Sequence, residues 1–295
     1  MEHPLHFMSD GLKLSGVLHV PEKRRDGERL PTFIVLHGFV GTKDESHAEL
    51  QARMLEEFGY CAFRIDMRGC GQSEGARGEV RCFDQVADTK NAFTFISERE
   101  EVDPARIGVI GHSFGAAVAV YTAGIDERFA CVISSCGWGD GERKFRGQHP
   151  TPEAWAKFTD MLERGRRHRA ETGESLWVSR FDVVPIPEAL RKNLSPKALF
   201  EVPVETAISM YDFRADDVVA SIAPRPLLLF HTAKDVITPM EQSVRLFEKA
   251  GQNAELMIVT GTSHFPLSEK DAPRTRVLIQ SWLDKFFPTP LRDRK

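Results

Sequence analysis

The chain has 295 residues, of which 41% are hydrophobic and 28% are charged; its formal net charge is −4 and its pI is near 6.2. This composition is ordinary for a soluble globular protein, and the length suffices for a large core. The weak negative charge argues against the basic surface that nucleic acids and anionic membranes attract, so neither is an expected partner.

The amino-terminal residues and the cysteines bear on location. Residues 1–6 carry an acidic side chain and no apolar run, so we expect no signal peptide. A membrane span needs about 18 consecutive apolar residues, and the sequence contains no such stretch. The five cysteines form no Cys-x-x-Cys motif, and their odd number predicts reduced thiols in a cytoplasmic protein. A homodimer is compatible with the sequence, which leaves the oligomeric state open.

Strand and helix patterns alternate along most of the chain. Residues 5–20 predict a strand hairpin around a Ser-Asp-Gly turn. Apolar runs typical of buried strands follow at 32–36, 60–65, 107–110, 129–134, 226–231 and 255–259. Helical periodicity lies between or after them at 44–58, 83–99, 240–250 and 275–287. This alternation predicts an α/β fold with a mostly parallel central sheet that helices cover on both faces.

The composition changes between residues 138 and 213. This stretch contains Trp138, Trp155 and Trp177, three of the four tryptophans, together with clustered charges and several prolines. Residues 153–169 have the spacing of an amphipathic helix. The prolines argue against buried sheet strands in this stretch. We therefore expect a mainly helical segment here.

The strand patterns on either side of this segment assign residues 1–137 and 214–295 to one α/β core. Ligands of open α/β sheets bind at the carboxyl ends of the strands. We expect residues 138–213 to form a helical cap or lid over that end of the sheet. Its three tryptophans are predicted either to pack within the cap or to contact substrate, and both interpretations stay open.

A Gly-His-Ser-Phe-Gly turn lies between a strand pattern and a helix pattern in the range Ile107–Val120. Glycines at positions 111 and 115 let strand and helix approach closely. The sharp turn then holds the hydroxyl of Ser113 clear of the backbone, at the carboxyl end of the sheet. In this context the motif predicts a nucleophilic serine. The N–H of Phe114, at the start of the helix, faces any negative charge that develops beside the hydroxyl.

A serine hydroxyl needs a base within hydrogen-bond reach and an acceptor that orients the base. Asp235 follows the strand pattern 226–231, and His264 follows the last strand pattern. Both residues are therefore expected at the same end of the sheet as Ser113, in the chain order Ser, Asp, His. We predict that these three residues form a catalytic triad. The sequence has no metal-ligand spacing and no Gly-x-Gly-x-x-Gly motif, so we expect no metal and no cofactor.

The serine turn and its two partners resemble the α/β-hydrolase superfamily over most of the chain outside the insertion. Two further phrases resemble the bacterial cinnamoyl and feruloyl esterase group: His-Gly-Phe-x-Gly-x-Lys-Asp-Glu-x-His at 37–47 and Asp-Met-Arg-Gly-x-Gly-x-Ser-Glu-Gly at 66–75. The resemblance implies the α/β-hydrolase fold and makes the backbone N–H of Phe39 the second donor of an oxyanion hole. From the residues themselves, Asp66 and Arg68 are expected to hold their loop together and not to contact substrate.

The leading hypothesis is a serine hydrolase, a carboxylesterase, that cleaves a carboxylic ester of a small molecule through an acyl-enzyme intermediate. A second hypothesis keeps the triad for another bond: an amide or peptide, a thioester, or a carbon–carbon bond. A third is a non-catalytic small-molecule receptor on a hydrolase fold, against which the intact triad argues.

Overall fold

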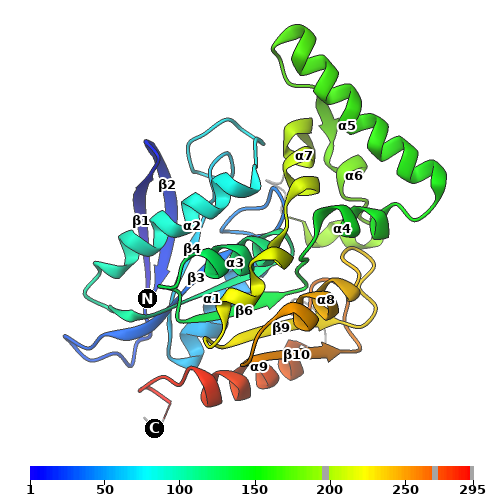
Figure 1. Cartoon of the computed structure of the whole chain (residues 1–295). Coiled ribbons are helices and arrows are strands. Elements are labelled where there is room, and N and C mark those ends of the chain that lie inside the picture. The colour runs from blue at the N-terminus through cyan, green and yellow to red at the C-terminus, as the bar shows by residue number, and fades with distance from the viewer. Residues whose placement is uncertain (195–198, 268–271, 293–295) are drawn as a thin grey trace.

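The computed structural model of the chain describes residues 1–194, 199–267 and 272–292. Its main sheet has eight strands: β1 (Glu2–Ser9), β2 (Leu12–His19), β3 (Leu30–Leu36), β4 (Cys61–Ile65), β5 (Val102–His112), β6 (Cys131–Ser135), β9 (Leu227–Thr232) and β10 (Ala254–Val259). Their order across the sheet is β1-β2-β4-β3-β5-β6-β9-β10 (Figure 1). β2 runs antiparallel to both of its neighbours, β1 and β4, and neighbouring strands are parallel in the rest of the order, β4-β3-β5-β6-β9-β10. The predicted mostly parallel sheet is confirmed.

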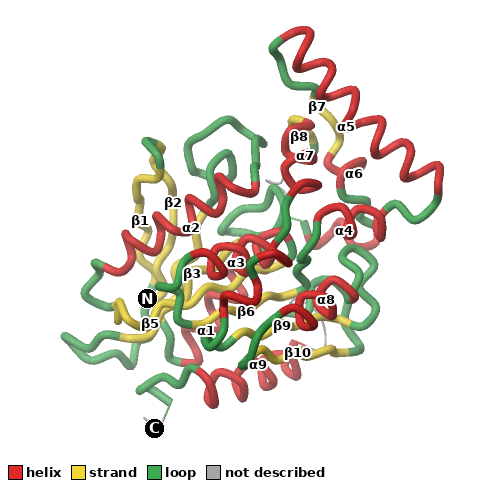
Figure 2. The backbone as a smooth tube through the Cα atoms, viewed as in Figure 1, coloured by secondary structure: helices red, strands yellow, loops and turns green. Residues whose placement is uncertain are grey.

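Helices cover both faces of this sheet (Figure 2). The core helices are α1 (Ser46–Phe58), α2 (Cys82–Ser97), α3 (Phe114–Ile125), α8 (Glu241–Lys249) and α9 (Ala272–Phe286). α1, α2, α8 and α9 lie where helical periodicity predicts a helix, within a few residues at either end, and α3 begins directly after the predicted serine turn. Among the described residues, no helix has both the length and the apolar composition that a membrane span requires.

Successive residues of the central strands point alternately into two hydrophobic clusters. In β9, Leu227 and Leu229 belong to the cluster that α2, α3 and α8 cover. The intervening Leu228 and Phe230 belong to the cluster that α1 and α9 cover. The alternation follows from strand geometry, in which neighbouring side chains point to opposite faces. Because both faces are buried, these strands appear in the sequence as continuous apolar runs.

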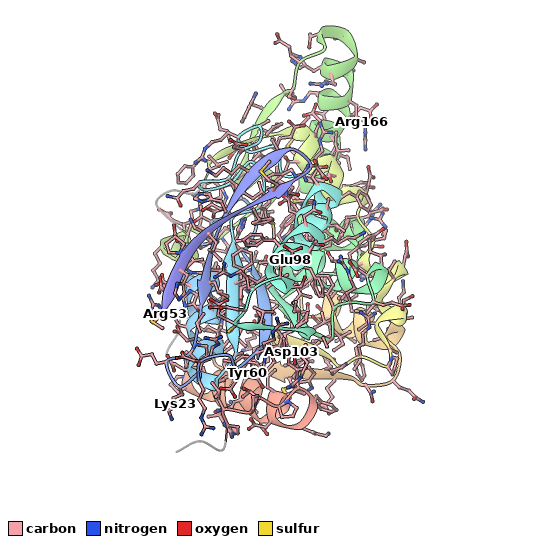
Figure 3. The ribbon with its side chains drawn as sticks, turned by 90° about the vertical axis from the view of Figure 1, so that its left-hand side faces the viewer. Lys23, Arg53, Tyr60, Glu98, Asp103 and Arg166 are labelled. Atoms are coloured by element: carbon pink, nitrogen blue, oxygen red, sulfur yellow. The ribbon has the colours of Figure 1, made fainter. Side chains whose placement is uncertain are left out.

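The described residues of the segment 138–213 form four α-helices and a small separate sheet. The helices are α4 (Gly141–Gln148), α5 (Pro152–Thr172), α6 (Arg180–Val183) and α7 (Val204–Asp212), and the sheet pairs β7 (Trp177–Ser179) with β8 (Glu201–Pro203). In Figure 3, Arg166 of α5 and Tyr60, which directly precedes β4, lie at opposite ends of the molecule. The long helix α5 is therefore on the side of the strands' carboxyl ends. The two short strands are not predicted from the sequence; they pair with each other and stay outside the main sheet.

Asp66 and Arg68 hold the loop after β4 together, as predicted. The carboxylate of Asp66 accepts hydrogen bonds from the backbone N–H and the Nζ of Lys43 (2.6 and 3.0 Å) and from the backbone N–H of Gln72 (2.9 Å). Arg68 donates from Nε and Nη2 to Asp88 of α2 (2.9 and 2.6 Å). The bonds between Asp66 and Lys43 join the loop after β4 to the loop after β3, which reaches the candidate site, and those of Arg68 join it to α2.

Lys144 of α4 is buried between the insertion and the core. Its Nζ lies 3.8 Å from the ring centroid of Phe145 and 5.6 Å from that of Trp138, without a hydrogen-bond partner in the described structure. Burial lowers the pKa of Lys144 from 10.5 to about 7. Between these values the unfolded chain binds more protons than the folded chain, so stability rises with pH across this window. The buried amine therefore costs most at and below neutral pH.

We expect Lys144→Met to raise the free energy of unfolding by about 1–4 kcal/mol at about pH 6, because an apolar side chain replaces a buried charge. The gain should shrink toward about pH 9, where the wild-type lysine is already neutral in the folded state. Urea unfolding followed by circular dichroism measures both values. Lys157→Met, at an exposed position of α5, is the control. A loss of stability in Lys144→Met at the acid pH would contradict this expectation and show that the contacts with the aromatic rings outweigh desolvation.

Candidate active site

Ser113 lies in the turn between β5 and α3 with a strained backbone. Its φ of 54° and ψ of −113° are uncommon for a residue with a side chain. The N–H of Ser113 donates to the carbonyl of Ser135 on the neighbouring strand (2.8 Å), and its own carbonyl accepts from the N–H of Ala116 (3.1 Å). These hydrogen bonds hold the strained turn in place. The side chain therefore stands at the carboxyl end of the sheet, where the sequence predicts it.

Close backbone contacts explain the two glycines that flank this serine. A Cβ atom on Gly111 would lie 2.1 Å from the carbonyl oxygen of Gly115. A Cβ atom on Gly115 would lie 2.5 Å from the carbonyl oxygen of His37, in the loop after β3. The strand, the helix and this loop can meet only because both positions lack a side chain.

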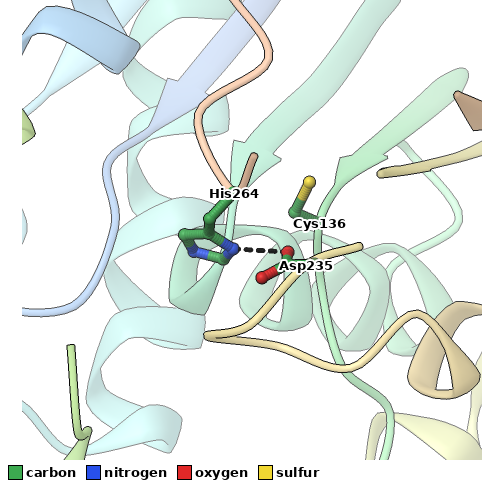
Figure 4. Close-up of side chains that lie close together, drawn as sticks. All are labelled: Cys136, Asp235 and His264. Carbon is green, nitrogen blue, oxygen red and sulfur yellow. Dashed lines mark hydrogen bonds and ion pairs between the residues drawn. The ribbon is translucent and has the colours of Figure 1, made fainter. Parts of the chain in front are cut away.

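Asp235 and His264 come together at the carboxyl ends of β9 and β10 (Figure 4). Nδ1 of His264 lies 2.6 Å from Oδ2 of Asp235, and Oδ1 accepts the backbone N–H groups of Ile237 and Thr238, each at 2.8 Å. Burial favours a higher pKa for Asp235, but the charge of His264 and hydrogen bonds from His231 and His264 outweigh it and hold the pKa well below its usual value. An ionised Asp235 only accepts hydrogen bonds, so Nδ1 of His264 is the donor and Nε2 is left for another partner.

Ser113, His264 and the turn after β3 line the same small cavity, which has a volume of about 30 Å³. Gly38 and Phe39 line the same cavity, and a Cβ atom on Gly38 would lie 3.9 Å from Cβ of Ser113. Phe114 is the first residue of α3, so its N–H has no acceptor within the helix. The rings of Phe39 and Phe114 are 6.1 Å apart. The structure thus brings both residues beside Ser113, and their role as oxyanion donors stays a prediction.

The three tryptophans of the insertion lie elsewhere. Trp138 is fully buried beside Lys144, and Trp155 packs against Phe158 of its own helix. Trp177 is 53% exposed and lines a larger cavity of about 530 Å³ on the insertion. In the described structure none of the three lines the cavity of Ser113. The sequence leaves open whether the tryptophans pack within the insertion or contact substrate. Trp138 and Trp155 pack within the insertion.

His231, the penultimate residue of β9, supports Asp235 from the sheet side. Its Nε2 lies 2.9 Å from the carbonyl oxygen of Thr238 and 3.4 Å from Oδ2 of Asp235, and its Nδ1 lies 2.7 Å from Oγ of Ser243. The carbonyl can only accept, so Nε2 carries the proton and shares it with the carboxylate. From the sequence, His231 is predicted only to lie near the end of a strand. Its contact with Asp235 depends on the fold of the loop at 232–240.

Cys136 also lies close to the carboxylate of Asp235. It has a φ of 51°, and one potential metal-ligand atom from each of Cys136, Asp235 and His264 lies within 4.8 Å of the other two (Figure 4). The 2.6 Å between Asp235 and His264 is the length of a charge-assisted hydrogen bond. We therefore interpret this cluster as the support of an acid–base pair and not as a metal site.

Two more buried imidazoles pack beside His264. The ring centroid of His112 is 4.7 Å from that of His264, and that of His47 is 4.1 Å from that of His112. Within the described chain the ring nitrogens of His47 lack hydrogen-bond partners. Burial lowers the pKa of His47 to about 3 and that of His112 well below its usual value. Both rings are therefore neutral at neutral pH and add no charge beside His264.

Comparison with known proteins assigns the chain to a family. A family model described as "Serine aminopeptidase, S33" matches residues 28–271, and the chain belongs to this family of α/β-hydrolases. Thiohydrolase aneE of Aspergillus aculeatus is 34% identical over 258 residues, which cover 81% of this chain and 78% of that protein. The sequence-based assignment to the α/β-hydrolase superfamily is thus confirmed.

Solved structures share the fold along nearly the whole chain. The α/β-hydrolase GrgF of Penicillium sp. sh18 has a TM-score of 0.80 at 23% identity and covers 97% of this chain and 99% of its own. Est1E of Butyrivibrio proteoclasticus with bound ferulic acid has a TM-score of 0.69 at 18% identity and covers 96% of this chain and 98% of its own. At these identities the similarity confirms the fold alone.

The close contact between Gly111 and the carbonyl of Gly115 leads to a prediction about stability. Gly111→Ala should lower the free energy of unfolding by at least about 3 kcal/mol, because the new methyl group overlaps the carbonyl of Gly115. Gly27→Ala is a suitable control, since Gly27 has a positive φ but open space around its Cα; it should cost only about 1 kcal/mol. Chemical denaturation of both variants measures the difference. Equal losses would mean that the close contact at Gly111 relaxes at little cost.

Proposed function

We propose that this protein is a serine hydrolase that cleaves a carboxylic ester of a small molecule through an acyl-enzyme intermediate. One observation carries the proposal: the strained Ser113 and His264 line one cavity, and Nδ1 of His264 lies 2.6 Å from the buried carboxylate of Asp235. Nucleophile, base and orienting acid are the three groups that acyl transfer requires.

In the proposed reaction, Oγ of Ser113 attacks the ester carbonyl while Nε2 of His264 takes its proton. The carboxylate of Asp235 stabilises the resulting imidazolium. The N–H groups of Phe39 and Phe114 hold the tetrahedral oxyanion, and each such donor lowers the barrier by about 3–4 kcal/mol. Collapse of the intermediate transfers the proton from His264 to the departing alcohol. Water then repeats the sequence on the acyl-enzyme and releases the acid.

A thioester is the second candidate substrate. The relative from Aspergillus aculeatus is named a thiohydrolase and matches 81% of this chain, which supports the same triad acting on a sulfur leaving group. The description of the family as serine aminopeptidases favours tests of an amide as well. Matched butanoyl substrates with p-nitrophenol or N-acetylcysteamine as leaving group, together with an aminoacyl p-nitroanilide, separate these activities. Faster cleavage of the N-acetylcysteamine substrate, after correction for intrinsic reactivity, would favour the thioester.

The nucleophile can be tested with a fluorophosphonate. Wild-type protein should gain one phosphonyl group by intact-mass spectrometry, and Ser113→Ala should gain none. Ser134→Ala, which removes a buried hydroxyl of the neighbouring strand β6, is the matched control and should be labelled like wild type. Folded wild-type protein that remains unlabelled would contradict the assignment of Ser113 and favour a binding protein.

The orienting role of Asp235 predicts a large loss of turnover. Asp235→Asn should lower kcat by about 10³- to 10⁴-fold, because the amide can leave His264 in the wrong tautomer. Asp182→Asn, which changes an exposed carboxylate of α6, should keep wild-type kcat. Steady-state kinetics on p-nitrophenyl butanoate, with circular dichroism to verify folding, measures both. A folded Asp235→Asn variant within tenfold of wild type would mean that another group orients His264.

A further inference from the structure

The cavity of Ser113 contains two charged side chains that the proposed mechanism does not use. Glu45 follows the turn after β3 and is 7% exposed; Arg180 is the first residue of α6 in the insertion and is 2% exposed. Among the described residues, Oε2 of Glu45 and Nε of Arg180 have no hydrogen-bond partner. Buried polar atoms of this kind are costly unless a ligand or water satisfies them.

Arg180 connects the insertion to the turn that carries Phe39. Its Nη2 donates to the carbonyl of Phe39 (3.1 Å), and its Nη1 donates to the carbonyl of Leu199 (3.3 Å). The guanidinium also lies over the ring of Phe39, 5.7 Å from the centroid. Both terminal nitrogens are thus engaged, while the Nε–H has no acceptor among the residues described.

Glu45 is held against the same turn. A Cβ atom on Gly41 would lie 1.9 Å from Oε2 of Glu45, so the carboxyl group fills the space beside that glycine. Burial raises the pKa of Glu45 to about 7, against the charge of Arg180 and a hydrogen bond from the backbone of Thr42. Above neutral pH the ionised group offers an acceptor oxygen, and its charge interacts with that of Arg180.

The free donor and the free acceptor belong to residues that line one cavity, so they limit which substrate group can pair with both. An alkyl chain would leave both unpaired, a carboxylate would face Glu45, and an ammonium would face Arg180. A hydroxyl accepts from the Nε–H and donates to the carboxylate, so it satisfies both. The cavity of about 30 Å³ has room for a group of this size beside the nucleophile.

We propose that Glu45 and Arg180 select substrates whose acyl chain carries a hydroxyl group close to the scissile carbonyl. The proposal rests on the proposed function, since it places the acyl group on Ser113. The two residues act as specificity determinants: they bind the hydroxyl and take no part in bond cleavage. Arg180 has a second, structural contact with Phe39, so its test needs a measure that a structural role alone does not change.

The ratio of kcat/KM between hydroxyacyl and plain acyl substrates is a measure that a purely structural role of Arg180 does not change. We would compare kcat/KM for butanoyl, 2-hydroxybutanoyl and 3-hydroxybutanoyl substrates with the leaving group that wild type cleaves faster, p-nitrophenol or N-acetylcysteamine. Rates of hydroxide-catalysed hydrolysis of the same compounds correct for intrinsic reactivity. After correction, wild type should prefer one hydroxyacyl isomer over butanoyl by about 10- to 100-fold, the usual cost of leaving buried polar groups unpaired.

Variants of the two residues should abolish this preference. Glu45→Leu and Arg180→Met should each lower the hydroxyacyl-to-butanoyl ratio at least about tenfold, and Glu45→Gln, which keeps an acceptor oxygen, should retain part of it. Matched controls are Glu205→Leu, a half-buried acid of α7 whose carboxylate oxygens are buried outside the cavity, and Arg191→Met, an arginine on the ring of Phe181 outside the cavity. Both should keep the wild-type ratio.

Fluorophosphonate labelling of every variant separates this inference from the proposed function. Labelled wild type without a hydroxyacyl preference, or labelled variants that lose both activities equally, would overturn the inference and leave the hydrolase assignment intact. The second result would assign Arg180 to positioning of Phe39 alone. Wild type that is neither labelled nor active would overturn the proposed function itself.

Discussion

The candidate site depends on the close approach of three backbone segments around Ser113. The end of β5, the start of α3 and the loop after β3 come so near one another that a single Cβ atom at Gly111 or Gly115 would overlap a carbonyl oxygen. Ser113 has a strained φ at this contact, and the rings of Phe39 and Phe114 lie 6.1 Å apart beside it. The strain is maintained by the packing of the sheet around it, so the geometry of the nucleophile is built into the core.

The charges around this turn are arranged so that one ionised group, Asp235, directly faces His264. Two backbone N–H groups and the proton shared by His231 stabilise that carboxylate in a buried place. The neighbouring imidazoles of His47 and His112 are neutral because burial disfavours their charged forms. An imidazolium that forms at His264 therefore meets one buried negative charge and no competing positive imidazole.

Much of the fold follows from the sequence because periodicity and glycine placement are local signals. The apolar runs of the central strands, the serine turn and the order of Ser113, Asp235 and His264 all lie on the chain in the pattern that the structure requires. The residues around the candidate triad, such as Glu45 and Arg180, cannot be identified from local patterns in this way. Glu45 lies within the phrase at 37–47 that resembles esterases, yet nothing local shows that its carboxyl group is buried beside Arg180. Arg180 lies 135 residues further along the chain, in the insertion, whose packing no local pattern predicts.

The most direct test of the central claim is to find the acyl group on the protein. Wild type and a Ser113→Ala variant would be mixed with p-nitrophenyl butanoate, quenched in acid within the first turnovers and digested for peptide mass spectrometry. One butanoyl group on the peptide that contains Ser113 would agree with the proposed mechanism. Rapid turnover by wild type with a butanoyl group on a residue other than Ser113 would contradict it.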